Sequence, residues 1–90
     1  MDTVGERLCA LRKAVLFTQQ ELADRMGCRW RTDVAKLESG WLKCSLASTR
    51  RRLARAVGVP LDPLDRYLEG NLSLDDLLER RIVVDELEAP

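Results

Sequence analysis

The sequence predicts an all-α protein, and three observations lead to this prediction. Apolar residues recur at spacings of three and four, which is the helical period, in one segment after another. Gly27, Gly40 and Gly58 follow three of these segments, where a helix commonly ends in a left-handed residue. No strong strand signal occurs outside the β-prone run that begins at "RIVV" near the end. We therefore expect a five-helix domain, followed by a short C-terminal helix and an acidic tail.

The first two expected helices are defined by an apolar stripe and by a cap. Helix one covers about residues 3–15, where the stripe consists of Val4, Leu8, Leu11 and Val15. Thr18 is suited to cap helix two, because its hydroxyl can accept from the backbone three residues on while Glu21 reaches back. That helix should end at Gly27, with an inner face of Leu22, Ala23 and Met26.

The third helix must end before Gly40, with Val34 and Leu37 pointing inward. Its start stays open, since Thr32 and Asp33 are both plausible caps.

Three further helices are expected in the rest of the chain. Helix four covers about residues 45–57, and its inner face is Leu46, Leu53, Ala56 and Val57. In helix five, Pro63 suits the first turn, and the apolar face is Leu64, Tyr67 and Leu68. Ser73 should cap a sixth helix, "LDDLLERR".

Composition excludes several classes of protein. A chain of 90 residues is one small domain that needs most of its apolar residues for a core, which leaves little room for a deep catalytic pocket. Histidine is absent, and Cys9, Cys28 and Cys44 have no metal-ligand spacing, so we expect no catalytic site, no metal and no cofactor. No apolar run suggests a membrane span or a signal peptide, and we expect a cytoplasmic location.

The net charge of zero conceals an uneven distribution of charge. Residues 1–60 contain 12 basic and 6 acidic residues, a net charge of +6, whereas residues 61–90 contain 3 basic and 9 acidic residues, a net charge of −6. Such asymmetry predicts a basic half that faces a polyanion and an acidic end with another task.

Four motifs, in order, carry a family resemblance. They read "GERLCALRKA", "TQQELADRMG", "VAKLESG" and "RLARAVGVPLDPL", and they cover roughly residues 4–68. They resemble the Cro/lambda-repressor-like (XRE-type) family of helix-turn-helix DNA-binding domains. The resemblance implies five helices, a third helix at about residues 31–39 in the major groove, and homodimers on palindromic double-stranded DNA. Residues 1–70 would form this domain, and residues 71–90 a separate dimerisation or partner segment.

The resemblance also assigns roles to individual residues. It implies that Arg31, Thr32 and Lys36 read base edges, and that Gln19 contacts a phosphate. It further implies a structural salt bridge between Arg12 and Glu38.

Chemistry supports the basic residues independently of the resemblance. Arg31 can donate twice to guanine, and Lys36 can reach a base or a phosphate. Arg29 and Lys43, in the flanking loops, suit phosphate contacts.

The chain departs from the family pattern in three places. Leu16 stands where Gly is usual, Trp30 stands near the expected capping Ser, and Trp41 stands where a basic residue is common. The segment from Gly27 to Gly40 is also one residue longer than usual, so the register of the base-reading residues stays open by one position.

For several residues a plainer interpretation competes with a functional one. Arg50, Arg51 and Arg52 point in different directions and are interpreted as a solvated face. Trp30 and Trp41 either touch the thymine methyls or sugars of DNA or form a lid on the core. The cysteines are interpreted as small buried thiols, and the acidic residues of the sixth helix as its charged outer face: Asp75, Asp76 and Glu79.

The C-terminal segment leaves the partner question open. A stripe of Leu74, Leu77, Leu78 and Ile82 either packs on the protein's own core or joins two subunits, and we favour dimerisation, to which "RIVV" could add an edge strand. The expected function is a sequence-specific transcriptional regulator, a dimeric repressor from a bacterium or a phage. The alternative is an antitoxin or adaptor whose acidic end, residues 71–90, binds a protein partner.

Overall fold

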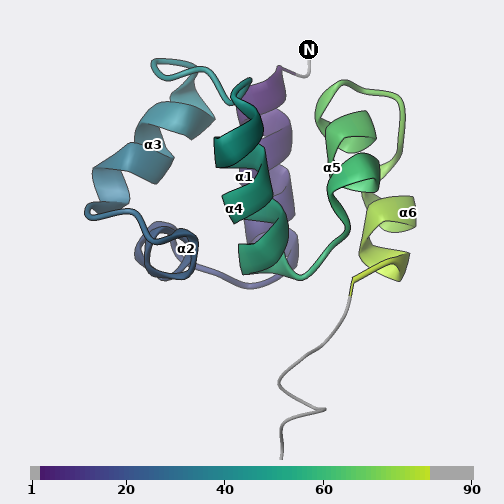
Figure 1. Cartoon of the computed structure of the whole chain (residues 1–90), viewed down its shortest axis with the longest axis horizontal. Helices are drawn as coiled ribbons and strands as arrows, with labels where there is room; N and C mark the ends of the chain where they lie inside the picture. Colours follow the sequence, from purple (N-terminus) through teal and green to yellow (C-terminus); the bar gives the residue numbers. More distant parts are fainter. Residues whose placement is uncertain (1–2, 82–90) are drawn as a thin grey trace, which may run out of the picture.

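The described part of the chain is built from helices alone. The structure is a computed structural model that describes residues 3–81, and it contains no strand in that range. The helices are α1 (Val4–Ala14), α2 (Gln19–Met26), α3 (Arg31–Ser39), α4 (Ala47–Val57), α5 (Leu61–Leu68) and α6 (Leu74–Glu79). Figure 1 shows α1 and α4 in the middle, with α2 and α3 on one side and α5 and α6 on the other. The all-α prediction is confirmed for these residues.

Capping explains where the first two helices begin. Thr18 accepts from the backbone N–H of Glu21, and the Glu21 carboxylate accepts from the Thr18 N–H, as predicted. Thr3 and Glu6 form a second capping box at α1, which was not predicted from the sequence. Both reciprocal bonds satisfy N–H groups that a helix start leaves without a partner.

Left-handed glycines end three of the helices, as the sequence predicted. Gly27, Gly40 and Gly58 have φ angles of 76°, 86° and 76° and follow α2, α3 and α4 directly. Leu16 also adopts a positive φ, 64°, between α1 and α2. It thus occupies a glycine-like conformation at the position where the sequence departs from the family pattern.

Helix α3 covers residues 31–39, as expected, but its candidate caps and one predicted inner-face residue of α4 are wrong. Helix α3 begins at Arg31 with Trp30 at the cap, so Thr32 and Asp33 lie inside its first turn and neither caps it. Helix α4 begins at Ala47, and Leu46 is its extended N-cap residue with 65% of its surface exposed. An N-cap residue lies outside the helical repeat, so the inward position predicted for Leu46 from that repeat does not hold.

One core is shared by all six helices. Its fully buried side chains come from every helix, among them Leu8, Leu22, Val34, Leu53, Leu64 and Leu77. Helix α1 packs on α3 and α5, α2 packs on α3 and α4, and α6 packs on α5. Gly5 allows α1 to approach α3 closely, because a side-chain carbon there would overlap the backbone carbonyl of Glu38.

The C-terminal helix belongs to this core. Leu77 has no exposed surface within its own chain, and Leu74 and Leu78 pack against the same cluster. The dimerisation that we favoured for this stripe is therefore wrong for Leu77, which is consumed by intramolecular packing. Ile82 and most of "RIVV" lie outside the described residues.

Polar contacts connect α1 to α5, in addition to the packing of α1 against α3. The Tyr67 hydroxyl donates to the Arg7 carbonyl oxygen at 2.6 Å, and Arg7 Nη1 donates to the Leu68 carbonyl oxygen at 3.1 Å. Helix α1 is thus fixed on both sides. None of the helices within residues 3–81 is long and apolar enough to cross a membrane.

Candidate nucleic-acid interface

The outer face of α3 presents cations to solvent. Arg31, Thr32 and Lys36 are all exposed, on a helix whose opposite face buries Val34 and Leu37. Neither Arg31 nor Lys36 forms an ion pair with another residue of the described range 3–81. The three residues predicted to read bases therefore lie together on one accessible surface of one helix.

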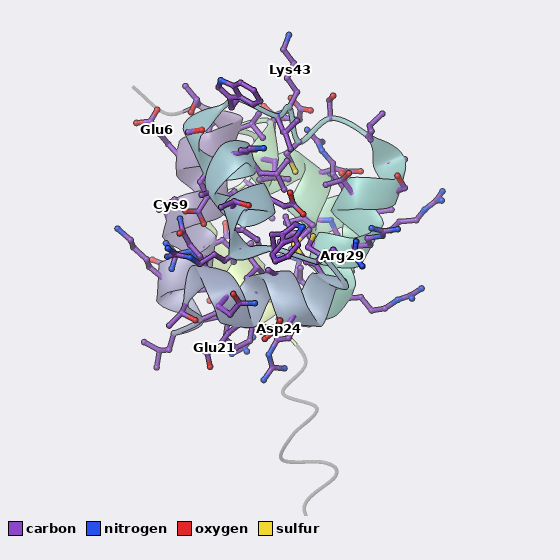
Figure 2. All side chains as sticks on the ribbon, turned by 90° about the vertical axis from the view of Figure 1, so that its left-hand side faces the viewer. Glu6, Cys9, Glu21, Asp24, Arg29 and Lys43 are labelled. Carbon is purple, nitrogen blue, oxygen red and sulfur yellow. The ribbon has the colours of Figure 1, made fainter. Side chains whose placement is uncertain are left out.

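Loop cations stand at both ends of this helix. Arg29 precedes α3 and Lys43 follows it, and both side chains are exposed. Figure 2 looks onto the side of the molecule that carries α2 and α3, with Lys43 extending away from the body. Since both residues also lack an ion pair within the described part of the chain, positive charge extends along the whole length of α3.

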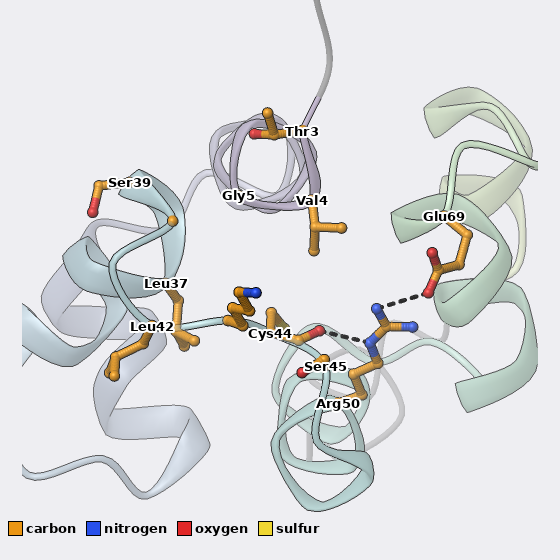
Figure 3. Close-up of a pocket in the computed structure, with 12 residues that line it drawn as sticks. Thr3, Val4, Gly5, Leu37, Ser39, Leu42, Cys44, Ser45, Arg50 and Glu69 are labelled. Atoms are coloured by element: carbon orange, nitrogen blue, oxygen red, sulfur yellow. Dashed lines mark hydrogen bonds and ion pairs between the residues drawn. The ribbon is translucent and has the colours of Figure 1, made fainter.

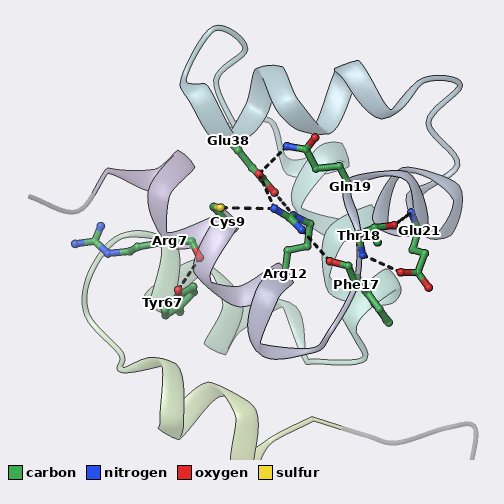
Figure 4. Close-up of polar contacts among 9 residues, drawn as sticks. All are labelled: Arg7, Cys9, Arg12, Phe17, Thr18, Gln19, Glu21, Glu38 and Tyr67. Atoms are coloured by element: carbon green, nitrogen blue, oxygen red, sulfur yellow. Dashed lines mark hydrogen bonds and ion pairs between the residues drawn. The ribbon is translucent and has the colours of Figure 1, made fainter.

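A nearly buried ion pair fixes the inner side of α3. Arg12 Nε lies 2.6 Å from Glu38 Oε2 and Arg12 Nη2 lies 3.3 Å from Oε1, with 11% and 7% of the two side chains exposed. Arg12 also donates to the Phe17 carbonyl oxygen at 2.8 Å (Figure 4). The hydrogen bonds to Glu38 raise the pKa of Arg12, although burial opposes this. This is the salt bridge that the resemblance implies, and it joins α1 to α3.

Gln19 is part of the same network. Its Nε2 donates to Glu38 Oε1 at 3.1 Å, so α2, α1 and α3 meet at one carboxylate (Figure 4). The phosphate contact predicted for Gln19 remains a prediction. In the structure the Gln19 amide donates to the Glu38 carboxylate, and this hydrogen bond helps to fix the position of α3 relative to α2.

The two tryptophans are not lids on the core. Trp30 and Trp41 are 62% and 76% exposed, at the start of α3 and just beyond its end. Lys36 Nζ lies 5.2 Å from the centroid of the Trp41 ring, and the Arg29 guanidinium carbon lies 6.0 Å from that of Trp30. Of the two interpretations of these residues, the one that places them over the core is wrong.

A shallow depression on α3 contains residues that sequence reasoning missed. Its volume is about 430 Å³, its surface is predominantly apolar, and it is lined by Thr32, Ala35, Lys36, Ser39 and Trp41. Residues 32, 35, 36 and 39 follow the helical spacing of one face, so this spacing could have identified Ala35 and Ser39 as neighbours of the base-reading residues. Trp41 joins them because Gly40 turns the chain back beside the helix.

Arg50 corrects the prediction of a solvated arginine face. Its side chain is buried, and its Nε donates to the Cys44 carbonyl oxygen at 2.8 Å. Its Nη1 and Nη2 pair with Asp65 at 3.2 Å and with Glu69 at 3.0 Å. Figure 3 shows this guanidinium between the loop after α3 and the end of α5. Arg51 and Arg52 are exposed, as that prediction had them.

A second cavity lies beside Arg50, and the loop after α3 helps to form it. It has a volume of about 320 Å³ and lies between the first turn of α1 and the residues that follow α3, with Val4, Leu37 and Leu42 in its apolar wall (Figure 3). Arg50 already holds a carbonyl and two carboxylates here, so it offers no free charge to a ligand.

Two of the cysteines and the acidic residues within 3–81 are described by their burial and grouping. Burial raises the pKa of the Cys28 and Cys44 thiols, which disfavours the nucleophilic thiolate. Within residues 3–81, no group of three or more cysteine and acidic residues could hold a metal ion. Asp75, Asp76 and Glu79 are exposed on α6, with Asp75 and Asp76 in its first turn.

The site is thus the outer face of α3, with cations that have no ion-pair partner among residues 3–81 and with two exposed tryptophans at its ends, and the Arg12–Glu38 ion pair fixes its inner side. Comparison of the chain with protein-family models, with curated proteins and with solved structures found no significant match.

Proposed function

We propose that the chain is a sequence-specific DNA-binding transcriptional regulator that reads the major groove with α3. One observation carries the proposal: α3 exposes Arg31 and Lys36 without an ion-pair partner among residues 3–81, while Glu38 on the same helix is paired with Arg12. A helix that is held in a fixed position and exposes cations can bind in the major groove of double-stranded DNA, which is wide enough to admit an α-helix and is flanked by phosphates. The resemblance of α2 and α3 to an XRE-type helix-turn-helix supports the same function.

The two kinds of cation would have different tasks. Arg31 and Lys36 lie on the outer face of α3, where a guanidinium can donate twice to guanine O6 and N7. Arg29 and Lys43 lie in loops beyond the helix ends, where they can neutralise phosphates without reading sequence. Binding should therefore weaken steeply as the salt concentration rises.

Selection from a random duplex pool, followed by affinity measurements at several salt concentrations, tests the proposal. Arg31→Ala should reduce the preference for the selected duplex over a scrambled one by roughly 1–3 kcal/mol. Lys43→Ala should weaken binding to both duplexes alike and lower the slope of log affinity against log salt by about one.

Arg66→Ala is the matched control, because it removes an exposed arginine on α5, on the other side of the molecule from α3 (Figure 1). It should leave the sequence preference unchanged. If no duplex is selected, or if Arg31→Ala and Arg66→Ala behave alike, the proposal fails.

We further propose that the regulator acts as a homodimeric repressor in the cytoplasm of a bacterium or a phage-infected cell. Twofold symmetry matches two half-sites about one helical turn apart. The interface cannot be formed by Leu77, which is buried in its own chain. A selected site that is palindromic and a dimer mass in solution are the expected results, whereas a monomer on a single half-site would contradict dimerisation alone.

A partner-binding antitoxin or adaptor is the second candidate function. The observation that favours it is the cluster of exposed carboxylates on α6, Asp75, Asp76 and Glu79, at the acidic end of the chain. The informative variant lacks residues 82–90 and carries Asp75→Asn, Asp76→Asn and Glu79→Gln. It keeps α6, because Leu77 belongs to the core. Unchanged DNA affinity with loss of a basic protein partner would favour this function, and loss of operator binding would favour the regulator.

A further inference from the structure

We propose that the depression on α3 receives the C5-methyl group of a thymine, with Trp41 as its wall. The inference rests on the proposed function, because it concerns how the same face of α3 would distinguish one base pair from another. It adds a specificity-determining residue, Trp41, that lies outside the helix and outside the three residues predicted to read bases. The sequence had left a DNA contact of Trp41 open.

The first step is the chemistry of the depression. It is predominantly apolar, although it lies on the face of α3 that carries the free cations. Ala35 contributes a methyl group from the helix, and Trp41 contributes a large ring from the loop. An apolar surface of this kind gains free energy when another apolar group removes it from water. Arg31 and Lys36 therefore do not account for everything that this face can bind.

The second step is the position of Trp41. The ring is 76% exposed and is held against the end of α3, with Lys36 Nζ 5.2 Å from its centroid and its backbone N–H 3.4 Å from Ser39 Oγ. At the far end of the loop, the Cys44 carbonyl oxygen accepts from Arg50. The ring thus stands in a defined place beside residues 32, 35, 36 and 39, rather than at the tip of a free loop.

The third step identifies the occupant by its charge and its shape. Lys36 lines the depression and Arg31 lies in the first turn of the same helix, and neither has an ion-pair partner in the described part of the chain. The occupant must therefore bring negative charge along with an apolar group. A DNA duplex does this, because the thymine methyl is the apolar group that a base pair presents in the major groove. A second copy of the same face would instead oppose these cations with its own.

The experiment compares thymine with deoxyuridine, which lacks only the methyl group. In the duplex selected by the protein, each thymine is replaced by deoxyuridine, one position at a time. At one position per half-site the affinity should fall about fourfold, which is the effect of burying one methyl group. The same replacement should have no effect on the affinity of Trp41→Ala, and a reduced effect on that of Trp41→Phe.

Trp30→Ala is the matched control. It removes the other exposed tryptophan, at the opposite end of α3, where the side chain does not line the depression. Trp30→Ala should retain the fourfold discrimination between thymine and deoxyuridine. Circular dichroism of all variants should show unchanged helix content, since the substituted tryptophans are exposed.

A spectroscopic readout covers the case in which the affinity changes are small. The chain has two tryptophans, so Trp30→Phe leaves Trp41 as the only one. Its emission should change on binding the thymine duplex and change less with the deoxyuridine duplex. An emission that is unaffected by either duplex would overturn the inference.

The remaining outcomes separate the two proposals. If the protein selects a duplex but no deoxyuridine replacement matters, or if Trp41→Ala keeps the discrimination, the inference is wrong and the regulator stands. If Trp41→Ala instead halves the mass of the protein in solution, the occupant is a second copy and the inference is wrong. If no duplex is bound at all, the proposed function itself fails.

Discussion

Replacement of Arg12 by Met would test whether the ion pair holds α3 in place. Met retains most of the apolar stem of Arg12 but donates no hydrogen bond. Glu38 would lose the contacts at 2.6 and 3.3 Å and would keep the Gln19 amide at 3.1 Å. With 7% of its side chain exposed, the carboxylate could regain little hydration. The variant therefore leaves a nearly buried charge with one hydrogen-bond donor.

The size of the effect follows from this burial. Removal of one partner of a buried ion pair costs about 3–5 kcal/mol, and the 11% exposure of Arg12 places this pair near the lower limit, at about 3 kcal/mol. For a domain of this length, 1 kcal/mol corresponds to roughly 4–8 °C in Tm, so Arg12→Met should lower Tm by at least about 12 °C. Glu38→Met should cost somewhat less, because Arg12 keeps the Phe17 carbonyl as an acceptor.

The assay is a double-mutant cycle in which urea unfolding is followed by circular dichroism. In Arg12→Met/Glu38→Met neither charge is left unpaired, so the double variant should be more stable than the sum of the single effects by about 2 kcal/mol. DNA affinity measured on the folded fraction should decrease in the same order. Effects on the free energy of unfolding that add within about 0.5 kcal/mol would refute the argument that these residues act as a pair.

Three further predictions concern the scaffold. Gly5→Ala should destabilise the fold by roughly 1–3 kcal/mol despite the better helix propensity of Ala, because its methyl group would overlap the Glu38 carbonyl. Urea unfolding measures this effect, and a stabilised variant would contradict the close approach of α1 to α3. Leu16→Gly should stabilise the fold by about 1 kcal/mol, since Leu16 is exposed and has a φ of 64°; a lower Tm would show that its side chain contributes packing. Burial raises the pKa of the Cys44 thiol in the folded state, so the unfolded chain loses that proton first as the pH rises. The stability contributed by the protonated thiol is therefore complete below about pH 8.5 and declines above it. Cys44→Ala should show a smaller decline in stability between about pH 8.5 and 10, and an identical pH profile would contradict this linkage.

Local signals predicted most of the helices correctly. Thr18 and Ser73 cap α2 and α6, and Gly27 ends α2, because each of these functions depends on residues within one turn. The ends of α3 illustrate the limit of such signals. Its C-terminal glycine was predicted, but its cap was not, since Trp30 occupies the cap position without a side-chain hydrogen bond and neither Thr32 nor Asp33 does.

The burial and ion pairing of Arg50 could not be predicted, for a different reason. Its carboxylate partners, Asp65 and Glu69, are 15 and 19 positions away and reach it only after α5 has packed on α4. Nothing in the local pattern distinguishes Arg50 from Arg51 and Arg52, which stay in solvent. Long-range pairing of this kind requires the tertiary arrangement.

For the candidate site, helical spacing placed Arg31, Thr32 and Lys36 correctly on one exposed surface of α3. It could not place Trp41 beside them, since that position depends on the turn made at Gly40.

The loop after α3 is clamped at both ends. The Leu42 N–H donates to the Lys36 carbonyl oxygen at 3.1 Å, and the Cys44 carbonyl oxygen accepts from Arg50 at 2.8 Å. These anchors use backbone atoms of the loop, so they do not depend on which side chains Trp41 and Lys43 carry. A library that varies only these two positions would therefore sample new surface chemistry on an unchanged framework, which makes this loop a natural place to engineer altered recognition.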